Sequence, residues 1–89
     1  MKVVLHHTAE KYLMKLNAAD RSRIGNAIDE LEKEPPEGDI RSYKGSPGLL
    51  RLKIGGYRAL FKIENDEILV THIEPRGQAY TRKTRNRRV

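Results

Sequence analysis

The sequence contains no cysteine, which excludes disulfide bonds, thiolate chemistry and cysteine-ligated metal sites. It also has no run of about 18 apolar residues and no signal-peptide pattern, so we expect a soluble, cytoplasmic protein with no membrane partner. Its three histidines, His6, His7 and His72, match no ligand spacing of a known metal site, and we expect no metal or other cofactor. The 89 residues have room for one domain with one modest core.

Two long stretches lack acidic residues. Between residues 40 and 63 every charged residue is basic, namely Arg41, Lys44, Arg51, Lys53, Arg58 and Lys62. The same holds between residues 75 and 89, where the charged residues are Arg76, Arg82, Lys83, Arg85, Arg87 and Arg88. Residues 1–39 have more acids than bases, and residues 64–74 have acids but no lysine or arginine. The formal charge of +6 is therefore segregated, which favours a polyanionic partner over mere solubility.

Residues 49–63 predict a β-hairpin. Two apolar runs flank Gly55-Gly56, a strong signal for a two-residue primed turn. This loop length fixes the register, which pairs Ile54 with Tyr57, Lys53 with Arg58, and Leu52 with Ala59. Side chains alternate between the faces of a strand. One face therefore presents Leu50, Leu52, Ile54, Tyr57, Ala59, Phe61 and Ile63, and the other presents Arg51, Lys53, Arg58 and Lys62.

The predicted pairing sets two cations opposite one another. Like charges in such positions destabilise a sheet, and Arg51 lies one step away from the Lys53–Arg58 pair. An anion bound on this face would relieve the repulsion, and phosphate is the obvious candidate. The alternative is an ordinary solvated outer face of lysine and arginine.

The first half of the chain predicts a short strand and two helices. Residues 2–5 read as the strand, and Thr8 is placed to cap a helix over residues 9–16. Asn17 and Asp20 resemble a capping box that opens a second helix to about residue 33, which Pro35-Pro36 ends. We expect the charged residues of both helices to be solvated.

The second half predicts the rest of the sheet. Residues 40–44 are compatible with a short strand, followed by a turn at residues 45–48. After the hairpin, Asn65-Asp66 turns into a strand over residues 67–73. We therefore expect an α+β fold, with one N-terminal strand and a meander. Residues 1–80 form the single expected domain, and residues 81–89 a basic C-terminal tail.

Several short motifs occur together in this order. Lys44-Gly45-Ser46-Pro47-Gly48 precedes Leu50-Arg51-Leu52-Lys53-Ile54-Gly55-Gly56-Tyr57-Arg58, and the chain continues to Ile73-Glu74-Pro75-Arg76-Gly77-Gln78-Ala79-Tyr80. Over nearly its whole length the sequence resembles the RelE-type toxins of bacterial toxin–antitoxin pairs, within the RelE/ParE superfamily. The resemblance implies a small, mostly antiparallel sheet with two N-terminal helices packed on one face. It also implies an endoribonuclease site on the other face, usually acting on messenger RNA in the ribosome.

The residue types fit cleavage of RNA without a metal ion. The 2′-oxygen can attack the adjacent phosphate, leaving a 2′,3′-cyclic phosphate and a 5′-hydroxyl. This reaction needs a base for the 2′-proton, an acid for the leaving 5′-oxygen, and cations against the added negative charge. Clustered arginine and lysine supply the cations, while no glutamate is evident among the basic strand residues.

The resemblance also implies roles for individual residues. It places Arg51 and Lys53 at the phosphate and the reacting hydroxyl, and Arg58 as the arginine that stabilises the phosphate. Tyr80 matches the family's terminal tyrosine, which stacks on a base or transfers a proton, and Arg76 matches a basic residue of variable spacing. Packing of the tail is the alternative role for Tyr80. We read His72 as structural. The expected contacts to the RNA backbone are Lys44, Lys62, Arg82, Lys83 and Arg85.

The resemblance further implies an acidic, partly disordered antitoxin, bound in a heterotetramer or larger complex, and messenger RNA on the 70S ribosome. Two other functions remain open. A ParE-type toxin shares the fold but acts on DNA gyrase and is not a nuclease. A plain RNA-binding module would bind RNA on a basic sheet face without cutting it, and aromatic residues on that face would favour it.

Overall fold

The computed structural model describes residues 1–75. In chain order its elements are β1 (Lys2–Leu5), α1 (His7–Met14), α2 (Ala18–Asp29), the 3-10 helix η1 (Glu30–Glu32), β2 (Asp39–Ser42), β3 (Leu50–Ile54), β4 (Tyr57–Glu64) and β5 (Glu67–Pro75). The α+β class and the two N-terminal helices agree with the sequence analysis. None of the helices within residues 1–75 is both long and apolar enough to cross a membrane.

The two helices begin at different kinds of cap. The amide of Asp20 donates a 2.8 Å hydrogen bond to the side-chain oxygen of Asn17, so the predicted cap of α2 is confirmed. The prediction for α1 is wrong by about two residues. His6 is the cap, because its Nδ1 accepts a 3.2 Å hydrogen bond from the amide of Thr8, and Thr8 is already helical.

The five strands form one mixed sheet in the order β1-β5-β4-β3-β2. The pair β1–β5 is parallel, and the other three pairs are antiparallel. The short segment after residue 38 is a true strand, so the meander has four strands, β2 to β5. The β3–β4 register confirms the predicted pairs, with Lys53 opposite Arg58. Gly55 has a φ of 55°, and Asn65 and Asp66 have φ of 52° and 62°, as primed hairpin turns require.

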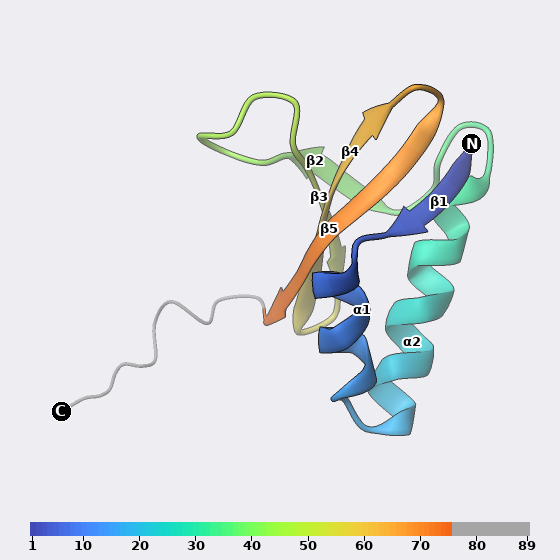
Figure 1. The fold of residues 1–89 in the computed structure, drawn as a ribbon, viewed down its shortest axis with the longest axis vertical. Coiled ribbons are helices and arrows are strands. Elements are labelled where there is room, and N and C mark those ends of the chain that lie inside the picture. The colour runs from blue at the N-terminus through green and yellow to red at the C-terminus, as the bar shows by residue number, and fades with distance from the viewer. Residues whose placement is uncertain (76–89) are drawn as a thin grey trace, which may run out of the picture.

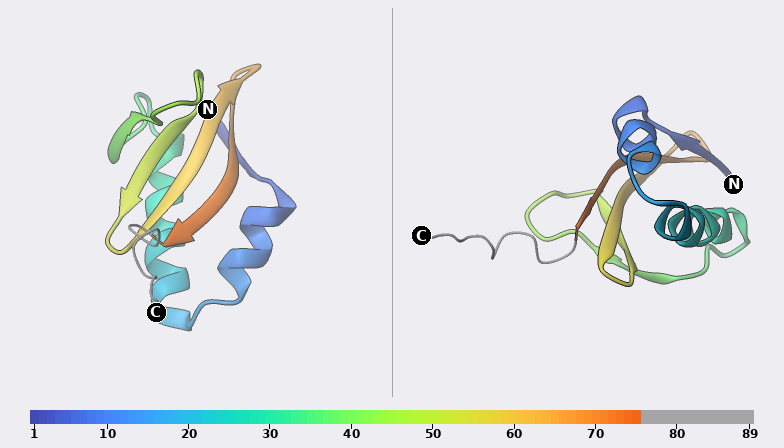
Figure 2. Two further views of the ribbon diagram at one scale, coloured as in Figure 1. Left: turned by 90° about the vertical axis from the view of Figure 1, so that its left-hand side faces the viewer. Right: turned by 90° about the horizontal axis from the view of Figure 1, so that it is seen from below.

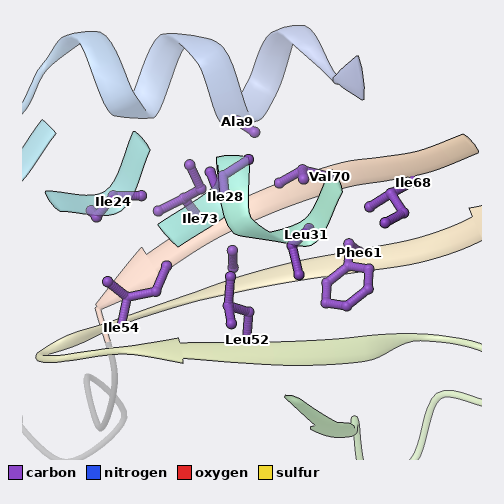
Figure 3. Close-up of a cluster of buried hydrophobic side chains, with 11 residues drawn as sticks. Ala9, Ile24, Ile28, Leu31, Leu52, Ile54, Phe61, Ile68, Val70 and Ile73 are labelled. Carbon is purple, nitrogen blue, oxygen red and sulfur yellow. The ribbon is translucent and has the colours of Figure 1, made fainter. Parts of the chain in front are cut away.

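The core lies between the helices and one face of the sheet (Figure 3). Its buried members are Ala9, Ile24, Ile28 and Leu31 from the helices, and Leu52, Ile54, Ala59, Phe61, Ile68, Val70 and Ile73 from the strands. The predicted apolar face of the hairpin supplies much of this set. Ile63 belongs to the same face but is 45% exposed, since it lies beside the β4–β5 turn.

Both helices lie on the same side of the sheet (Figure 1). We call the opposite side the open face, because no helix within residues 1–75 covers it; it faces the viewer in the left panel of Figure 2. Its strand residues include Asp39, Arg41, Arg51, Lys53, Arg58, Leu60, Lys62, Leu69, His72 and Glu74, with Lys2, Val4, Glu64 and Glu67 at the far end. The two-layer arrangement thus leaves the basic side of the central hairpin accessible.

An irregularity in β5 decides which of its residues reach the open face. The register pairs are Ala59–Ile73, Leu60–His72 and Phe61–Val70. Thr71 is therefore an extra residue on β5, a β-bulge. Val70 and Ile73 are both buried, although residues three positions apart lie on opposite faces of a regular strand. His72 and Glu74 consequently share the open face, where simple alternation from Val70 would have pointed them into the core.

Candidate functional site

Strand pairing arranges the open face in cross-strand rows. The first row runs Asp39–Lys53–Arg58–Glu74 from β2 to β5, and the second runs Arg41–Arg51–Leu60–His72. Residues opposite one another in neighbouring strands lie side by side on one face. The first row therefore places the two central cations between two carboxylates.

This charge pattern corrects one expectation. The sequence analysis found no acid near the Lys53–Arg58 pair, but Glu74 forms an ion pair with Arg58. Asp39 lies in register with Lys53 on the other side of the row. Both carboxylates come from outside residues 40–63, and strand pairing brings them in. Part of the repulsion between the cations is thus already offset by the protein itself.

Arg58 is held by two neighbours. Its Nε donates a hydrogen bond to Oε2 of Glu74, and its guanidinium carbon lies 5.4 Å from the centre of the Tyr43 ring. Within residues 1–75 the terminal nitrogens of this guanidinium have no hydrogen-bond partner. The side chain is 30% exposed. Arg58 can therefore present its two terminal NH2 groups to an anion while Glu74 fixes its orientation.

Arg51 and Lys53 make no ion pair with any other part of residues 1–75, whereas Arg41 lies 3.7 Å from Asp39. Arg51 is half-buried between Arg41 and the buried Leu60, and Lys53 is exposed. The structure therefore brings together three of the predicted catalytic residues, Arg51, Lys53 and Arg58, on adjoining strands.

The predicted RNA contacts are placed less uniformly. Lys62 lies on the open face, in register with Leu69, and its Nζ is 3.3 Å from Glu64. Lys44 lies in the loop between β2 and β3, beside a groove of about 640 Å³ lined by residues 42–50 and Ile63. The remaining site residues, Arg76, Tyr80, Arg82, Lys83 and Arg85, lie outside the described residues.

Sequence reasoning missed three residues of this face. Tyr43 follows β2 and reaches Arg58 from outside the hairpin, so the hairpin sequence gave no sign of an aromatic ring here. Glu74 and His72 reach the face through the bulge at Thr71. The three-residue spacing between Val70 and Ile73 was the available signal, because a regular strand cannot bury both.

The tip of the central hairpin is anchored on α2. The Tyr57 hydroxyl donates a 2.9 Å hydrogen bond to Asp20, which also accepts a 2.6 Å bond from Arg23. These bonds, with that from Tyr57 first, lower the pKa of Asp20. The hydrogen bond to Asp20, followed by burial, raises the pKa of Tyr57. Asp20 is thus an exception to the expected solvated helix surface, and it fixes the residue next to Arg58.

Comparisons with known proteins show the family of the chain and relatives of its fold. A family described as the ParE toxin of the type II toxin–antitoxin system parDE matches residues 3–80. No curated protein shows a significant match to the sequence.

The solved structures that share the fold include three toxin–antitoxin complexes. The archaeal RelE–RelB complex from Pyrococcus horikoshii OT3 contains a chain with a TM-score of 0.71 and 27% identity; the match covers 86% of this chain and 96% of that one. The RelB–RelE complex from Methanococcus jannaschii contains a chain with a TM-score of 0.70 and 24% identity; the match covers 86% of this chain and 94% of that one. For RelBE2 from Mycobacterium tuberculosis the TM-score is 0.72 and the identity 18%, with 84% of this chain and 96% of that one covered. These last two matches show a likeness of fold alone. The chain therefore belongs to the ParE toxin family of type II toxin–antitoxin systems, within the RelE/ParE superfamily that its motifs resemble.

Proposed function

We propose that this toxin is an endoribonuclease that cleaves messenger RNA, bound in the 70S ribosome, without a metal ion. One observation carries the proposal. Three cations on adjoining strands of the open face, Arg51, Lys53 and Arg58, retain donors that no residue in the 1–75 range engages. A solvated outer face does not require cations to gather at one place. A phosphate that undergoes transfer does, because the cations stabilise the negative charge that accumulates on its oxygens.

The chemistry is attack of the ribose 2′-oxygen on the adjacent phosphorus. The bond between phosphorus and the 2′-oxygen forms, and the bond to the 5′-oxygen breaks with its electron pair on that oxygen. The 2′-proton leaves to a base, and the 5′-oxygen takes up a proton. The terminal nitrogens of Arg58, with Arg51 and Lys53, offset the charge that accumulates on the phosphate oxygens. Tyr80 and Arg76 complete the site by resemblance to the RelE-type toxins.

Glu74 acts here as a positioning residue. It binds Arg58 through Nε, the nitrogen farthest from the end of the side chain, so the two terminal donors remain directed outward. A bidentate contact to phosphate needs those two donors. The ring of Tyr43 beside the same guanidinium offers a surface on which an RNA base can stack. Lys44, Lys62, Arg82, Lys83 and Arg85 add contacts to the RNA backbone.

The proposed protein partner is an acidic, partly disordered antitoxin that covers the basic surface in a heterotetramer or larger complex. The three structural neighbours described above are all toxins in complex with antitoxins, which supports a partner of this kind. The acid-free stretches of the sequence supply the complementary charge.

A second function has an observation in its favour. The matching family is described by its ParE members, and the alternative already named for this fold is a ParE-type toxin that acts on DNA gyrase. In addition, Arg58 already pairs with a carboxylate in the free protein, as it would if this arginine had only a structural role.

One experiment separates the possibilities. The full-length toxin is added to a translation mixture containing a defined message, and gyrase supercoiling is measured in parallel. We expect cut message with 2′,3′-cyclic phosphate and 5′-hydroxyl ends, and unchanged supercoiling. Loss of supercoiling with intact message would favour the gyrase function. RNA binding with neither effect would favour a non-catalytic RNA-binding module.

A further inference from the structure

We propose that His72 is a catalytic residue of this toxin, the general base that takes the proton from the 2′-hydroxyl. The inference rests on the proposed ribonuclease function and names a group that the reaction needs. The sequence alone suggested a structural histidine, and the position of the residue in the folded chain is what changes this interpretation.

The first supporting observation is where the side chain lies. His72 is exposed on the open face, in the same cross-strand row as Arg51. Its partner across the strand pair is Leu60, and Arg58 and Glu74 form the adjacent pair of the first row. The bulge at Thr71 is what turns the imidazole toward this side. His72 therefore lies on the strand next to that of Arg58, and Leu60 separates it from Arg51 within the row.

The second observation is a contact that orients the ring. The Thr71 hydroxyl donates a 3.3 Å hydrogen bond to the backbone oxygen of Leu60. A hydroxyl has one hydrogen, so toward His72 it acts only as an acceptor. Nδ1 of His72 lies 3.1 Å from that oxygen, and the proposal places the hydrogen of the neutral ring on this nitrogen. In the neutral ring the lone pair is then on Nε2.

This geometry is what a general base requires. A third group orients the ring through one nitrogen, and the basic nitrogen is left for the substrate. In the proposed step, Nε2 takes the proton of the 2′-hydroxyl as the 2′-oxygen bonds to phosphorus. The 5′-oxygen leaves with the electron pair of its former bond and takes a proton from water. Glu74, two positions farther along β5 on the same face, offsets the positive charge of the imidazolium.

Other groups near His72 have to be separated from it in a pH experiment. The charged or titratable residues nearest to it on the open face are Arg51 on β3, Arg58 on β4 and Glu74 on β5. Farther along these strands lie Lys53, Lys62, Glu64 and Glu67, and the neighbouring strand β1 carries Lys2. On the other side of the sheet, α1 carries His7, Glu10, Lys11 and Tyr12, and His6 precedes it. The arginines keep their charge over the whole working range. His7, an exposed histidine outside the open face, is the matched control.

The test measures single-turnover cleavage of a defined message by the full-length toxin across pH, for the wild type, His72→Gln and His7→Gln. Glutamine keeps the shape and polarity of the ring edge but does not transfer protons at these pH values. We expect His72→Gln to cleave about 100- to 10,000-fold more slowly than the wild type, with unchanged RNA affinity. The wild-type cleavage rate should rise with pH on the acidic side of its profile. This rise, the acidic limb, should be absent from His72→Gln. His7→Gln should retain both the rate and the limb.

Thr71 provides a second comparison. Thr71→Val removes the hydroxyl that orients the ring, whereas Thr71→Ser keeps it. We expect a slower rate for the valine variant, near wild-type behaviour for the serine variant, and equal thermal stability of the two. Nitrogen-15 chemical shifts of His72 in the wild type should report the hydrogen on Nδ1, and in the valine variant a mixture of tautomers.

The outcomes are distinguishable. If the wild type cleaves the message and His72→Gln cleaves it at the same rate, the role of His72 is overturned and the proposed function stands. A hydrogen found on Nε2 in the wild type would overturn the orientation by Thr71 and hence the base. Absence of cleavage by the wild type in the translation mixture would overturn the proposed function, and the catalytic role with it.

Discussion

The hydroxyl of Tyr57, at the start of β4, donates a 2.9 Å hydrogen bond to Asp20 in the first turn of α2. The two residues are far apart in sequence, and their contact joins the tip of the central hairpin to the helical layer. Tyr12 of α1 packs edge-on against the same tyrosine, with ring centres 6.5 Å apart. Tyr57 is followed directly by Arg58, so this contact also fixes the position of the strand that carries Arg58 in the candidate site.

Removal of this hydroxyl should weaken the fold modestly. Tyr57→Phe loses the bond to Asp20 but keeps the ring, and Asp20 still accepts from Arg23. We expect a melting temperature lower by a few degrees, measured by circular dichroism, with the native spectrum retained. Tyr43→Phe is the matched control, since the Tyr43 hydroxyl has no hydrogen-bond partner within residues 1–75. An equal loss in both variants would argue against the anchor.

The same contact predicts a pH dependence of stability. The folded protein holds the pKa of Asp20 below its ordinary value, mainly through the bond from Tyr57. A lowered carboxyl pKa contributes stability above the unfolded value of about 3.9, and this contribution is lost as pH falls through the folded pKa. The raised pKa of Tyr57 has the opposite sign, so its contribution is lost as pH rises above about 10.

We therefore expect the difference in melting temperature between wild type and Tyr57→Phe to be largest between roughly pH 5 and 9. It should shrink toward zero in acid below the Asp20 pKa and in alkali above the Tyr57 pKa. Melting curves of the two proteins across this range measure the difference directly. A difference that stays constant from acid to alkali would contradict the coupling between these two groups.

Arg58→Ala should abolish RNA cleavage while the domain stays folded. Loss of a charge-assisted contact to the transition state costs about 2–4 kcal/mol, roughly a 30- to 1,000-fold slower rate. Arg58→Lys should be only a partial replacement, because lysine lacks the two parallel donors. Arg41→Ala is the control, since Arg41 lies on the same face but pairs with Asp39 at the edge strand. Full activity in a folded Arg58→Ala protein would remove this residue from the site.

Glu74→Ala should separate binding from cleavage. The change removes a negative charge beside Arg58, so RNA should bind more tightly, and the effect should be greatest at low salt. The freed arginine loses its fixed orientation, so we expect single-turnover cleavage to slow by roughly tenfold or more. Filter binding and cleavage on the same message measure the two effects. Tighter binding together with faster cleavage would mean that Glu74 inhibits the site and does not position Arg58.

Deletion of residues 81–89 should weaken RNA binding mainly at low salt. The deleted segment carries Arg82, Lys83, Arg85, Arg87 and Arg88, and each phosphate contact adds a slope of about −0.7 to the salt dependence of binding to a single strand. Affinity measured over a salt series should therefore flatten, while single-turnover cleavage at saturating RNA stays nearly unchanged. A slower rate at saturation would assign this segment to the chemistry instead.

The sequence predicted the hairpin well because local rules determine it. A two-residue turn with glycine fixes the register, and alternation fixes the faces, so the Lys53–Arg58 pair followed from local sequence alone. The cap at Asn17 is equally local. The α1 cap was misplaced because His6 and Thr8 both have side chains that can accept from the first helical amides.

The missing parts of the site depend on long-range pairing. Glu74 joins Arg58, and Asp39 joins Lys53, only when β5 and β2 take their places beside the hairpin. Tyr43 reaches Arg58 across β3. Charge counting along the chain cannot find such partners, because it compares neighbours in sequence and not neighbours in the sheet.

The bulge at Thr71 makes the open face depend on how the chain length of β5 is accommodated against β4. Without the extra residue, the alternation set by Ile68 and Val70 would continue unbroken through the end of the strand. Deletion of Thr71 would therefore keep His72 and Glu74 on the open face and Ile73 in the core. Straightening the strand with Thr71 retained would do the opposite, turning His72 and Glu74 toward the core and bringing Ile73 out to water. Single substitutions remove one group at a time, but loss of the bulge without loss of a residue would exchange the two sides of β5 from residue 72 onward.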